Sequence, residues 1–448
     1  MYNLVSRFLL YSNISDDSIL KTLASTFEAH NRKMSSRQFL SEEEIEQNKT
    51  ETIQKIYTQI KKILDLGTTY GFNTNLWHNY LTYLMISTEN SFTLTCERMG
   101  AQPGGSVNIF ARKDFAIFKQ LFEYDFSKIE KDLDIDVFST ITDYKAIAKK
   151  ENIYNKEVSR IVQDLSLKIA AAEDEDEIFD IVTEHYKNCG VGLFGINRAF
   201  RIKNEGNGIE FIPVVNSDHV RLDDLIGLEY QKEQLVYNTL AFVNGRKANN
   251  VLLYGDAGTG KSTSVRAVLN EYHDKGLRMI EIYKHQFKDL AAVIAKIKDR
   301  NYRFIIFIDD LSFEEYEVEY KFLKVVIEGG VESRPENILI YATSNRRHLI
   351  KEQWKDRDDM EHSSNGELHR SDTLEEKLSL AGRFGVLINF SAPRREEFYE
   401  IVKVLAERHG IKMDEETLIA EANKWEISHG GVSGRTAQQF INYLEGLE

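Results

Sequence analysis

One segment in the middle of the chain has the residue types and spacing of a phosphate-binding loop. Residues 255–262 satisfy the pattern G-x-x-x-x-G-K-[ST], after a predicted strand and at the start of a predicted helix. Glycines let backbone N–H groups turn inward around phosphate oxygens, and the helix N-terminus adds a favourable dipole. The lysine would neutralise β- and γ-phosphate charge, and the serine hydroxyl would bind Mg²⁺. The residues expected to bind ATP here are Gly255, Asp256, Ala257, Gly258, Thr259, Gly260, Lys261, Ser262 and Thr263.

Two carboxylates follow an apolar run at residues 303–308, which we predict to be a buried strand. If this strand lies beside the phosphate loop, Asp309 can hold Mg²⁺ through water and Asp310 can polarise the attacking water. The expected metal ligands are therefore Ser262 and Asp309. The alternative interpretation is an acidic turn after a core strand.

Three further polar residues are candidates for contact with the phosphates. Asn345 follows the strand predicted over residues 338–343, where an amide could reach between the γ-phosphate and the water; an Asx turn is the alternative. Arg383 comes just before the last predicted strand, and Arg435 begins a helix near the C-terminus. Since an isolated arginine is usually a surface residue, the case for a role of these two at the site depends on the order of motifs along the whole chain.

The elements around these motifs predict an α/β domain followed by a small helical one. Apolar strands separated by amphipathic helices are typical of a parallel sheet covered on both faces. After residue 394 the predicted strands cease and helices take over. We therefore expect a core over residues 221–392 and a helical lid over residues 393–448. The predicted strands are 251–254, 278–283, 304–308, 338–343 and 386–390.

Residues 1–200 are predicted to form a mostly helical N-terminal domain, joined to the core by a linker over residues 201–220. Ser41 and Glu44 make a capping box ahead of a long periodic stretch. The aromatic residues of this half are most simply core, with a partner-docking surface as the alternative. The glycines of residues 190–195 match G-x-G-x-x-G by letter, but no strand precedes them, so a hinge is favoured over a nucleotide site.

Composition restricts the class of partner. The 448 residues include 57 Lys and Arg against 71 Asp and Glu, a net charge of −14, which argues against a general binder of nucleic-acid backbones and leaves room for a local basic groove. Only 2 cysteines occur, which favours a reducing, cytoplasmic location. We find neither the roughly 18 apolar residues of a membrane span nor a signal-peptide pattern.

Taken in order, the phosphate loop, the acid pair, residues 343–345, Gly382-Arg383-Phe384 and Gly434-Arg435 resemble the AAA+ ATPases. The resemblance is closer still to a bacterial AAA+ family catalogued as domain of unknown function 815. It implies a five-stranded parallel sheet with helices on both faces, a C-terminal helical lid and a helical N-terminal domain. The stretches that carry it are residues 222–228, 309–313, 328–335, 342–349 and 376–380, with 89–92, 192–195 and 198–200 upstream.

The resemblance also implies roles for individual residues. Leu225, Ile226 and Gly227 match the segment that lines the adenine pocket. One departure is that the second acid is usually Glu, whereas Asp310 has a shorter side chain; turnover could then be slow, or Glu314 could assist. The implied catalytic residues are Asp310, Asn345 as sensor 1, Arg435 as sensor 2 on the lid, and Arg383 as the arginine finger that reaches a neighbour's nucleotide.

These observations predict an ATP hydrolase that uses ATP and Mg²⁺, works as a homo-oligomer, and remodels a macromolecule, with a protein partner bound through residues 1–200. Residues 284–289 lack the aromatic-hydrophobic-Gly loop of AAA+ unfoldases, which argues against processive unfolding. One alternative is an ATP-gated interaction module with little turnover. Another is a helicase-loader-like remodeler of nucleic acid, suggested by the basic clusters at residues 346–348 and 394–395.

Overall fold

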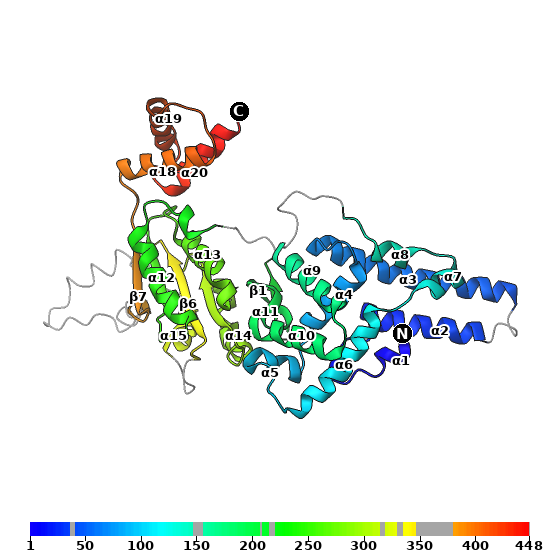
Figure 1. The fold of residues 1–448 in the computed structure, drawn as a ribbon. Coiled ribbons are helices and arrows are strands. Elements are labelled where there is room, and N and C mark those ends of the chain that lie inside the picture. The colour runs from blue at the N-terminus through cyan, green and yellow to red at the C-terminus, as the bar shows by residue number, and fades with distance from the viewer. Residues whose placement is uncertain are drawn as a thin grey trace. The chain divides into compact units, whose positions relative to one another are not determined.

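The chain folds into two compact units, Met1–Asn197 and Arg198–Glu448 (Figure 1). Among the described residues, no helix is long and apolar enough to cross a membrane. The computed structural model describes residues 1–35, 41–146, 156–206, 208–214, 220–313, 319–328, 335–345 and 380–447.

Unit 1, residues 1–197, is helical. The capping box predicted at the start of α3 is confirmed: Glu44 N donates to Ser41 Oγ (3.2 Å), and Ser41 N donates to Glu44 Oε2 (2.8 Å). The helices are α1 (Tyr2–Val5), α2 (Ile19–Ser35), α3 (Glu42–Tyr70), α4 (Leu76–Ser87), α5 (Ser91–Met99), α6 (Ser106–Phe122), α7 (Ser127–Leu133), α8 (Val137–Thr142), α9 (Lys156–Ala171), α10 (Glu175–Cys189) and α11 (Gly192–Ile196).

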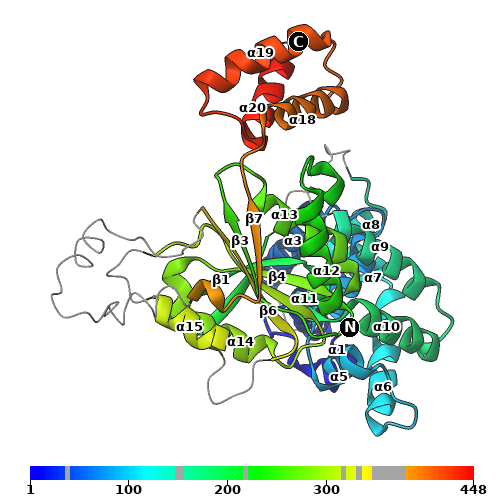
Figure 2. The same cartoon turned by 90° about the vertical axis from the view of Figure 1, so that its left-hand side faces the viewer.

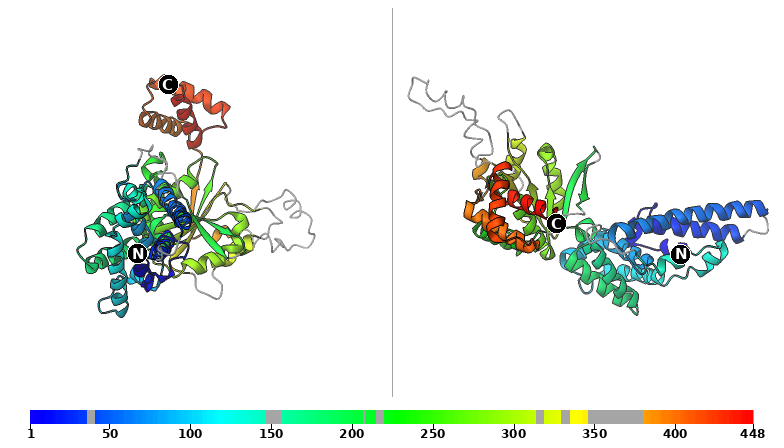
Figure 3. Two further views of the ribbon diagram at one scale, coloured as in Figure 1. Left: turned by 90° about the vertical axis from the view of Figure 1, so that its right-hand side faces the viewer. Right: turned by 90° about the horizontal axis from the view of Figure 1, so that it is seen from above.

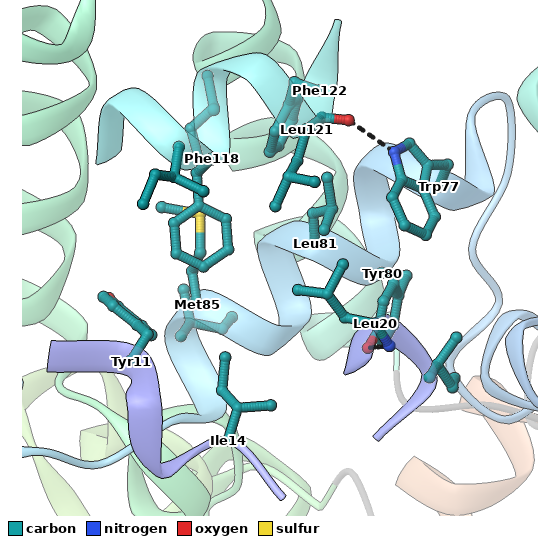
Figure 4. Packing of buried hydrophobic residues seen from close by; sticks show 14 of the residues in the cluster. Tyr11, Ile14, Leu20, Trp77, Tyr80, Leu81, Met85, Phe118, Leu121 and Phe122 are labelled. Atoms are coloured by element: carbon teal, nitrogen blue, oxygen red, sulfur yellow. Dashed lines mark hydrogen bonds between the residues drawn. The ribbon is translucent and has the colours of Figure 1, made fainter. Parts of the chain in front are cut away.

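Helix α4 carries much of the core of unit 1 (Figure 4). Trp77 is buried, and its indole N–H donates to the carbonyl of Leu121 on α6 (2.8 Å). The hydroxyl of Tyr80 accepts from the backbone N–H of Leu20 at the start of α2 (2.9 Å). The large aromatic residues of α4 and α6 are thus mainly core, with their polar atoms satisfied by hydrogen bonds.

The glycines between residues 190 and 195 make the turn from α10 into α11. Gly190 and Gly192 have φ values of 85° and 70°, and a Cβ on Gly192 would lie 2.0 Å from the carboxylate of Glu89. Only glycine fits a left-handed backbone this close to a neighbouring side chain. Among the described residues before this turn, the structure contains helices and no strand.

Unit 2, residues 198–448, contains a seven-stranded sheet in the order β2-β1-β4-β5-β6-β3-β7. The five strands predicted from the sequence, β3 to β7, pair in parallel throughout, which confirms the α/β fold class. Strand β6 is buried along its whole length, as a strand covered on both faces should be. The strands are β1 (Ala199–Asn204), β2 (Ile209–Pro213), β3 (Val251–Gly255), β4 (Leu277–Glu281), β5 (Arg303–Ile308), β6 (Ile338–Ser344) and β7 (Val386–Phe390).

Strands β1 and β2 occupy a range that we expected to be a linker, residues 201–220. They form an antiparallel hairpin, and β1 adds to the sheet in parallel beside β4. Phe200 and Ile202 are buried while Arg201 and Lys203 are exposed, the alternation of a half-buried strand. Because charged residues alternate with apolar ones, this short strand has no continuous apolar run and was not predicted.

Helices α12 (Glu229–Val243) and α13 (Lys261–Tyr272) cover one face of the sheet, and α14 (Leu290–Ile297) and α15 (Tyr320–Glu328) cover the other (Figure 2). The lid helices α18 (Arg395–Arg408), α19 (Glu415–Ser428) and α20 (Gly434–Glu445) follow β7 and pack around a core of their own (Figure 3). The fold therefore places a glycine-rich loop, a sheet edge and a helical lid in one unit.

Candidate nucleotide-binding site

The phosphate loop joins β3 to α13 in conformations that only glycine adopts easily. The φ values are 134° at Gly255, 75° at Gly258 and 93° at Gly260. Gly255 also passes so close to β7 that a Cβ would lie 2.2 Å from the carbonyl oxygen of Phe390. Since α13 begins at Lys261, the loop ends at a helix N-terminus, which favours an anion.

Lys261 lies over this loop and is only 7% exposed. Its ammonium donates to the carbonyl oxygens of Gly255 (3.0 Å) and Asp256 (2.5 Å). Burial lowers the pKa of Lys261, while the carboxylates of Asp256, Asp310 and Asp309 act to raise it. A buried cation held by two carbonyls over a glycine loop is placed to receive phosphate oxygens.

The two predicted metal ligands lie in direct contact. Ser262 Oγ, in the first turn of α13, donates to Oδ1 of Asp309 at the end of β5 (2.5 Å). Thr343 Oγ1, on β6, donates to the same oxygen (2.6 Å). The guanidinium of Arg266 lies 4.0 Å from the other oxygen, Oδ2.

Asp310 and Asn345 also come together at this edge of the sheet. Asn345 Nδ2 donates to Asp310 Oδ1 (3.0 Å), and the backbone N–H of Asp310 donates to Thr343 Oγ1 (2.9 Å). Asp310 has a φ of 52°, a left-handed conformation that costs energy in a residue with a side chain. The turn thus directs Asp310 toward the amide of Asn345.

The lid reaches the phosphate loop through the start of α20. The backbone N–H of Arg435 donates to the carbonyl of Gly258 (3.1 Å). A Cβ on Gly258 would lie 3.0 Å from Ser433 Oγ and 3.1 Å from Arg435 Cβ. Arg435 is also near enough for its positive charge to lower the pKa of Lys261.

The segment expected to line the adenine pocket lies beside the same loop. Leu225 is buried, and a Cβ on Gly260 would lie 3.7 Å from its side chain. Ile226 packs against the apolar core of the lid, and Gly227 has a φ of 70°. These residues therefore connect the loop with the lid.

Arg383 lies at the other end of the sheet. Strand β7 runs parallel to β3, with Val386 paired to Val251 and Phe390 paired to Gly255. Arg383 precedes the start of β7, and the four steps of that strand span about 13 Å at about 3.3 Å per residue. The structure therefore does not bring Arg383 to the phosphate loop of its own chain.

Other expectations fall outside the described residues. These are Glu314, the basic cluster at residues 346–348, and the parts of the family-like stretches within residues 329–334, 346–349 and 376–379. Of the second basic cluster, Arg395 pairs with Glu426 within the lid (3.0 Å).

Two contacts of the site were not expected from the sequence. Asp256 Oδ2 accepts from the backbone N–H of Ala392 (2.7 Å), which ties the phosphate loop to the segment after β7. Thr343 joins both acids of the site. The available signal was a threonine within a mostly apolar strand that is fully buried, since a buried hydroxyl needs a hydrogen-bond partner.

The residues at this site fit Mg²⁺. A hydroxyl and carboxylate oxygens are the donors that Mg²⁺ prefers, and it commonly takes one or two carboxylates together with phosphate oxygens. Among the residues that the structure describes, no group of three or more His, Cys, Asp or Glu could hold a metal by itself. A site of this kind suits a metal that arrives with a nucleotide.

Strands β3 to β7, taken in chain order as one to five, lie in the order 5-1-4-3-2, with the phosphate loop after the first and the acid pair after the third. With the helical lid, this arrangement defines the AAA+ class of ATPases, as the sequence indicated. The chain belongs to the family described as "Protein of unknown function (DUF815)", whose model matches residues 196–448. No curated protein matches the sequence.

Solved structures with similar folds include AAA+ proteins. A point mutant of RuvB from Thermotoga maritima is 18% identical, with a TM-score of 0.36 over 51% of this chain and 66% of that one, just under two thirds of its length. The RuvB Holliday junction branch migration motor from the same organism is 16% identical (TM-score 0.31; 50% and 72% covered). The FIGL-1 AAA domain in complex with ADP is 19% identical (TM-score 0.36; 52% and 75% covered).

Proposed function

We propose that this protein binds ATP together with Mg²⁺ and hydrolyses it, and that hydrolysis remodels a macromolecular partner. The observation that carries the proposal is the convergence of Lys261, the Ser262–Asp309 pair and the Asp310–Asn345 pair at one edge of the sheet. These are the groups that phosphoryl transfer needs: charge neutralisation, a metal site and a means of orienting water.

Each residue has a distinct task in this proposal. Lys261 exchanges its two carbonyl partners for phosphate oxygens. Ser262 and Asp309 would hold Mg²⁺, which would offset the charge of the phosphates. Asp310 orients the attacking water. Asn345 donates a hydrogen bond to the Asp310 carboxylate and would also contact the γ-phosphate. The lid contributes Arg435 through its contact with Gly258.

A second copy of the chain supplies the remaining cation. Arg383 precedes β7 at the end of the sheet away from its own phosphate loop. In this proposal it acts on the nucleotide of a neighbouring copy. Activity would then depend on a homo-oligomer. The acidic chain favours a protein partner, engaged by unit 1, and a cytoplasmic location suits a chain with only 2 cysteines.

Phosphate release by the purified protein tests the proposal. With ATP and Mg²⁺ the unmutated protein should release phosphate, while Asp310→Asn should keep ATP affinity within about twofold and lose most turnover, because it removes only the carboxylate charge near the water. No release by the unmutated protein at any concentration would refute hydrolysis.

One observation favours an ATP-gated interaction module with little turnover. Asp310 is shorter than the usual glutamate, and its Oδ1 is already engaged by Asn345. In that case nucleotide binding would position the lid and expose a docking surface. Asp310→Glu distinguishes the two functions. If the unmutated protein releases phosphate slowly and this substitution accelerates release at least about tenfold, the result supports the module, since general-base catalysis contributes about 10²–10⁴-fold. Brisk release without the substitution rejects it.

A further inference from the structure

A single side chain, Thr343, joins the two acids of the site. It is 2% exposed on β6, the strand between β5 and β3. Its hydroxyl accepts a hydrogen bond from the backbone N–H of Asp310 (2.9 Å) and donates its one proton to Asp309 Oδ1 (2.6 Å). Its own carbonyl accepts from the N–H of Leu311 (2.7 Å). The turn after β5 is thus bound to β6 at three consecutive residues.

These bonds fix the orientation of Asp309. Oδ1 accepts two hydroxyl protons, one from Ser262 and one from Thr343, so the carboxylate has little freedom to rotate. Because the proton of Ser262 points at Asp309, the lone pairs of that hydroxyl are free to face a metal. A hydrogen bond that orients a ligand in this way commonly controls metal affinity.

The same hydroxyl stabilises the unusual backbone of Asp310. A left-handed residue with a side chain persists only where its surroundings hold it, and here the N–H of Asp310 is held by Thr343. That conformation sets the direction of the Asp310 carboxylate toward Asn345.

We propose that Thr343 is a positioning residue that sets Asp309 for Mg²⁺ and Asp310 for water at the same time, without touching the nucleotide. The inference rests on the proposed function and adds to it a residue that couples metal binding to the orientation of water. A threonine suits the task because one hydroxyl can accept from one acid residue and donate to the other.

A purely structural role would predict a different result, and the chain offers a matched control. Thr239 on α12 is also fully buried; its hydroxyl donates to the carbonyl of Leu235 (2.8 Å) and lies 2.8 Å from the hydroxyl of Tyr341 on the same strand, β6. Thr239→Val removes a buried hydroxyl that contacts the same strand, without touching either acid. If Thr343 served only folding, the two valine variants would behave alike.

The test measures how the affinity of the full-length protein for a fluorescent ATP analogue depends on Mg²⁺ concentration. Thr343→Val should leave the affinity without Mg²⁺ within about twofold and raise the half-effective Mg²⁺ concentration by about 10–100-fold, the usual effect of losing such a partner. For Thr343→Ser, which keeps the hydroxyl, the half-effective Mg²⁺ concentration should stay within about threefold of that of the unmutated protein. For Thr239→Val it should equal that of the unmutated protein.

An unchanged Mg²⁺ dependence for Thr343→Val, or an equal shift for Thr239→Val, would overturn the inference. If Thr343→Val does not fold, Thr343→Ala removes the same hydroxyl with less bulk and is judged by the same criteria. Failure of the proposed hydrolysis is recognised separately, because the binding assay needs no turnover. Where turnover is present, Thr343→Val should also lower kcat by about tenfold or more while Thr343→Ser restores it.

Discussion

The two ends of strand β7 lie in different surroundings. At its C-terminal end, Phe390 pairs with Gly255 of the phosphate loop, and Ala392 just beyond donates to Asp256. At its N-terminal end, Val386 pairs with Val251, and Arg383 comes shortly before it. One end therefore belongs to the chain's own nucleotide site, and the other carries a cation that this site cannot use. The difference is the reason that our proposal assigns ATP binding to a single chain and the contribution of Arg383 to a neighbouring copy.

The largest effect is expected from the phosphate-loop end. Lys261→Ala should abolish ATP binding and all turnover, because it removes a buried cation that phosphates require. Isothermal titration with ATP and Mg²⁺ measures this directly. An affinity within about threefold of the unmutated protein would show that the phosphates bind elsewhere.

Arg383→Ala should separate binding from cleavage. ATP affinity should remain within about twofold, since Arg383 lies away from the loop, while turnover should fall by about 10³–10⁵-fold, the usual contribution of an arginine finger. Steady-state phosphate release at several protein concentrations gives the comparison. Turnover equal to that of the unmutated protein would remove Arg383 from the mechanism.

A pair of glycine substitutions tests how tightly β7 presses on the loop. Gly255→Ala places a Cβ 2.2 Å from the carbonyl of Phe390 at a φ of 134°, whereas Gly276→Ala has nothing within 4 Å at a φ of 84°. Gly276→Ala should lower the free energy of unfolding by about 1–2 kcal/mol, and Gly255→Ala by about 1–3 kcal/mol more, because it adds overpacking to backbone strain. Urea unfolding monitored by circular dichroism measures both. Equal losses would show that the loop has room against β7.

Contiguous motifs made the phosphate loop and both acids predictable. Each motif can be recognised from a few consecutive residues: a glycine-rich loop after one apolar strand, and a carboxylate at the end of another. Parallel strands bring such ends to one edge of the sheet. Roles for Arg383 and Arg435 could be proposed only through family resemblance, since nothing local distinguishes them from surface arginines. Hydrogen bonds such as that of Thr343 to Asp309 depend on the register between β5 and β6, which the sequence does not state.

The N-terminal part of the chain was less informative than the core. Its periodicity predicted helices and its aromatic residues predicted a packed interior, as Trp77 and Tyr80 illustrate. The hairpin of β1 and β2 was missed because short strands with charged outer faces lack a continuous apolar run. The motifs that we could interpret chemically all lie in unit 2, so the role of unit 1 is a question for experiment.

Complementation between two inactive variants tests most directly whether the catalytic site is shared between copies. Lys261→Ala keeps Arg383 but cannot bind ATP, and Arg383→Ala binds ATP but lacks the finger. If the finger acts on a neighbour, mixing the two should restore phosphate release well above the sum of the separate variants, because some interfaces combine an intact loop with an intact Arg383. No recovery over a range of ratios, in a mixture shown to form mixed oligomers, would contradict a shared site.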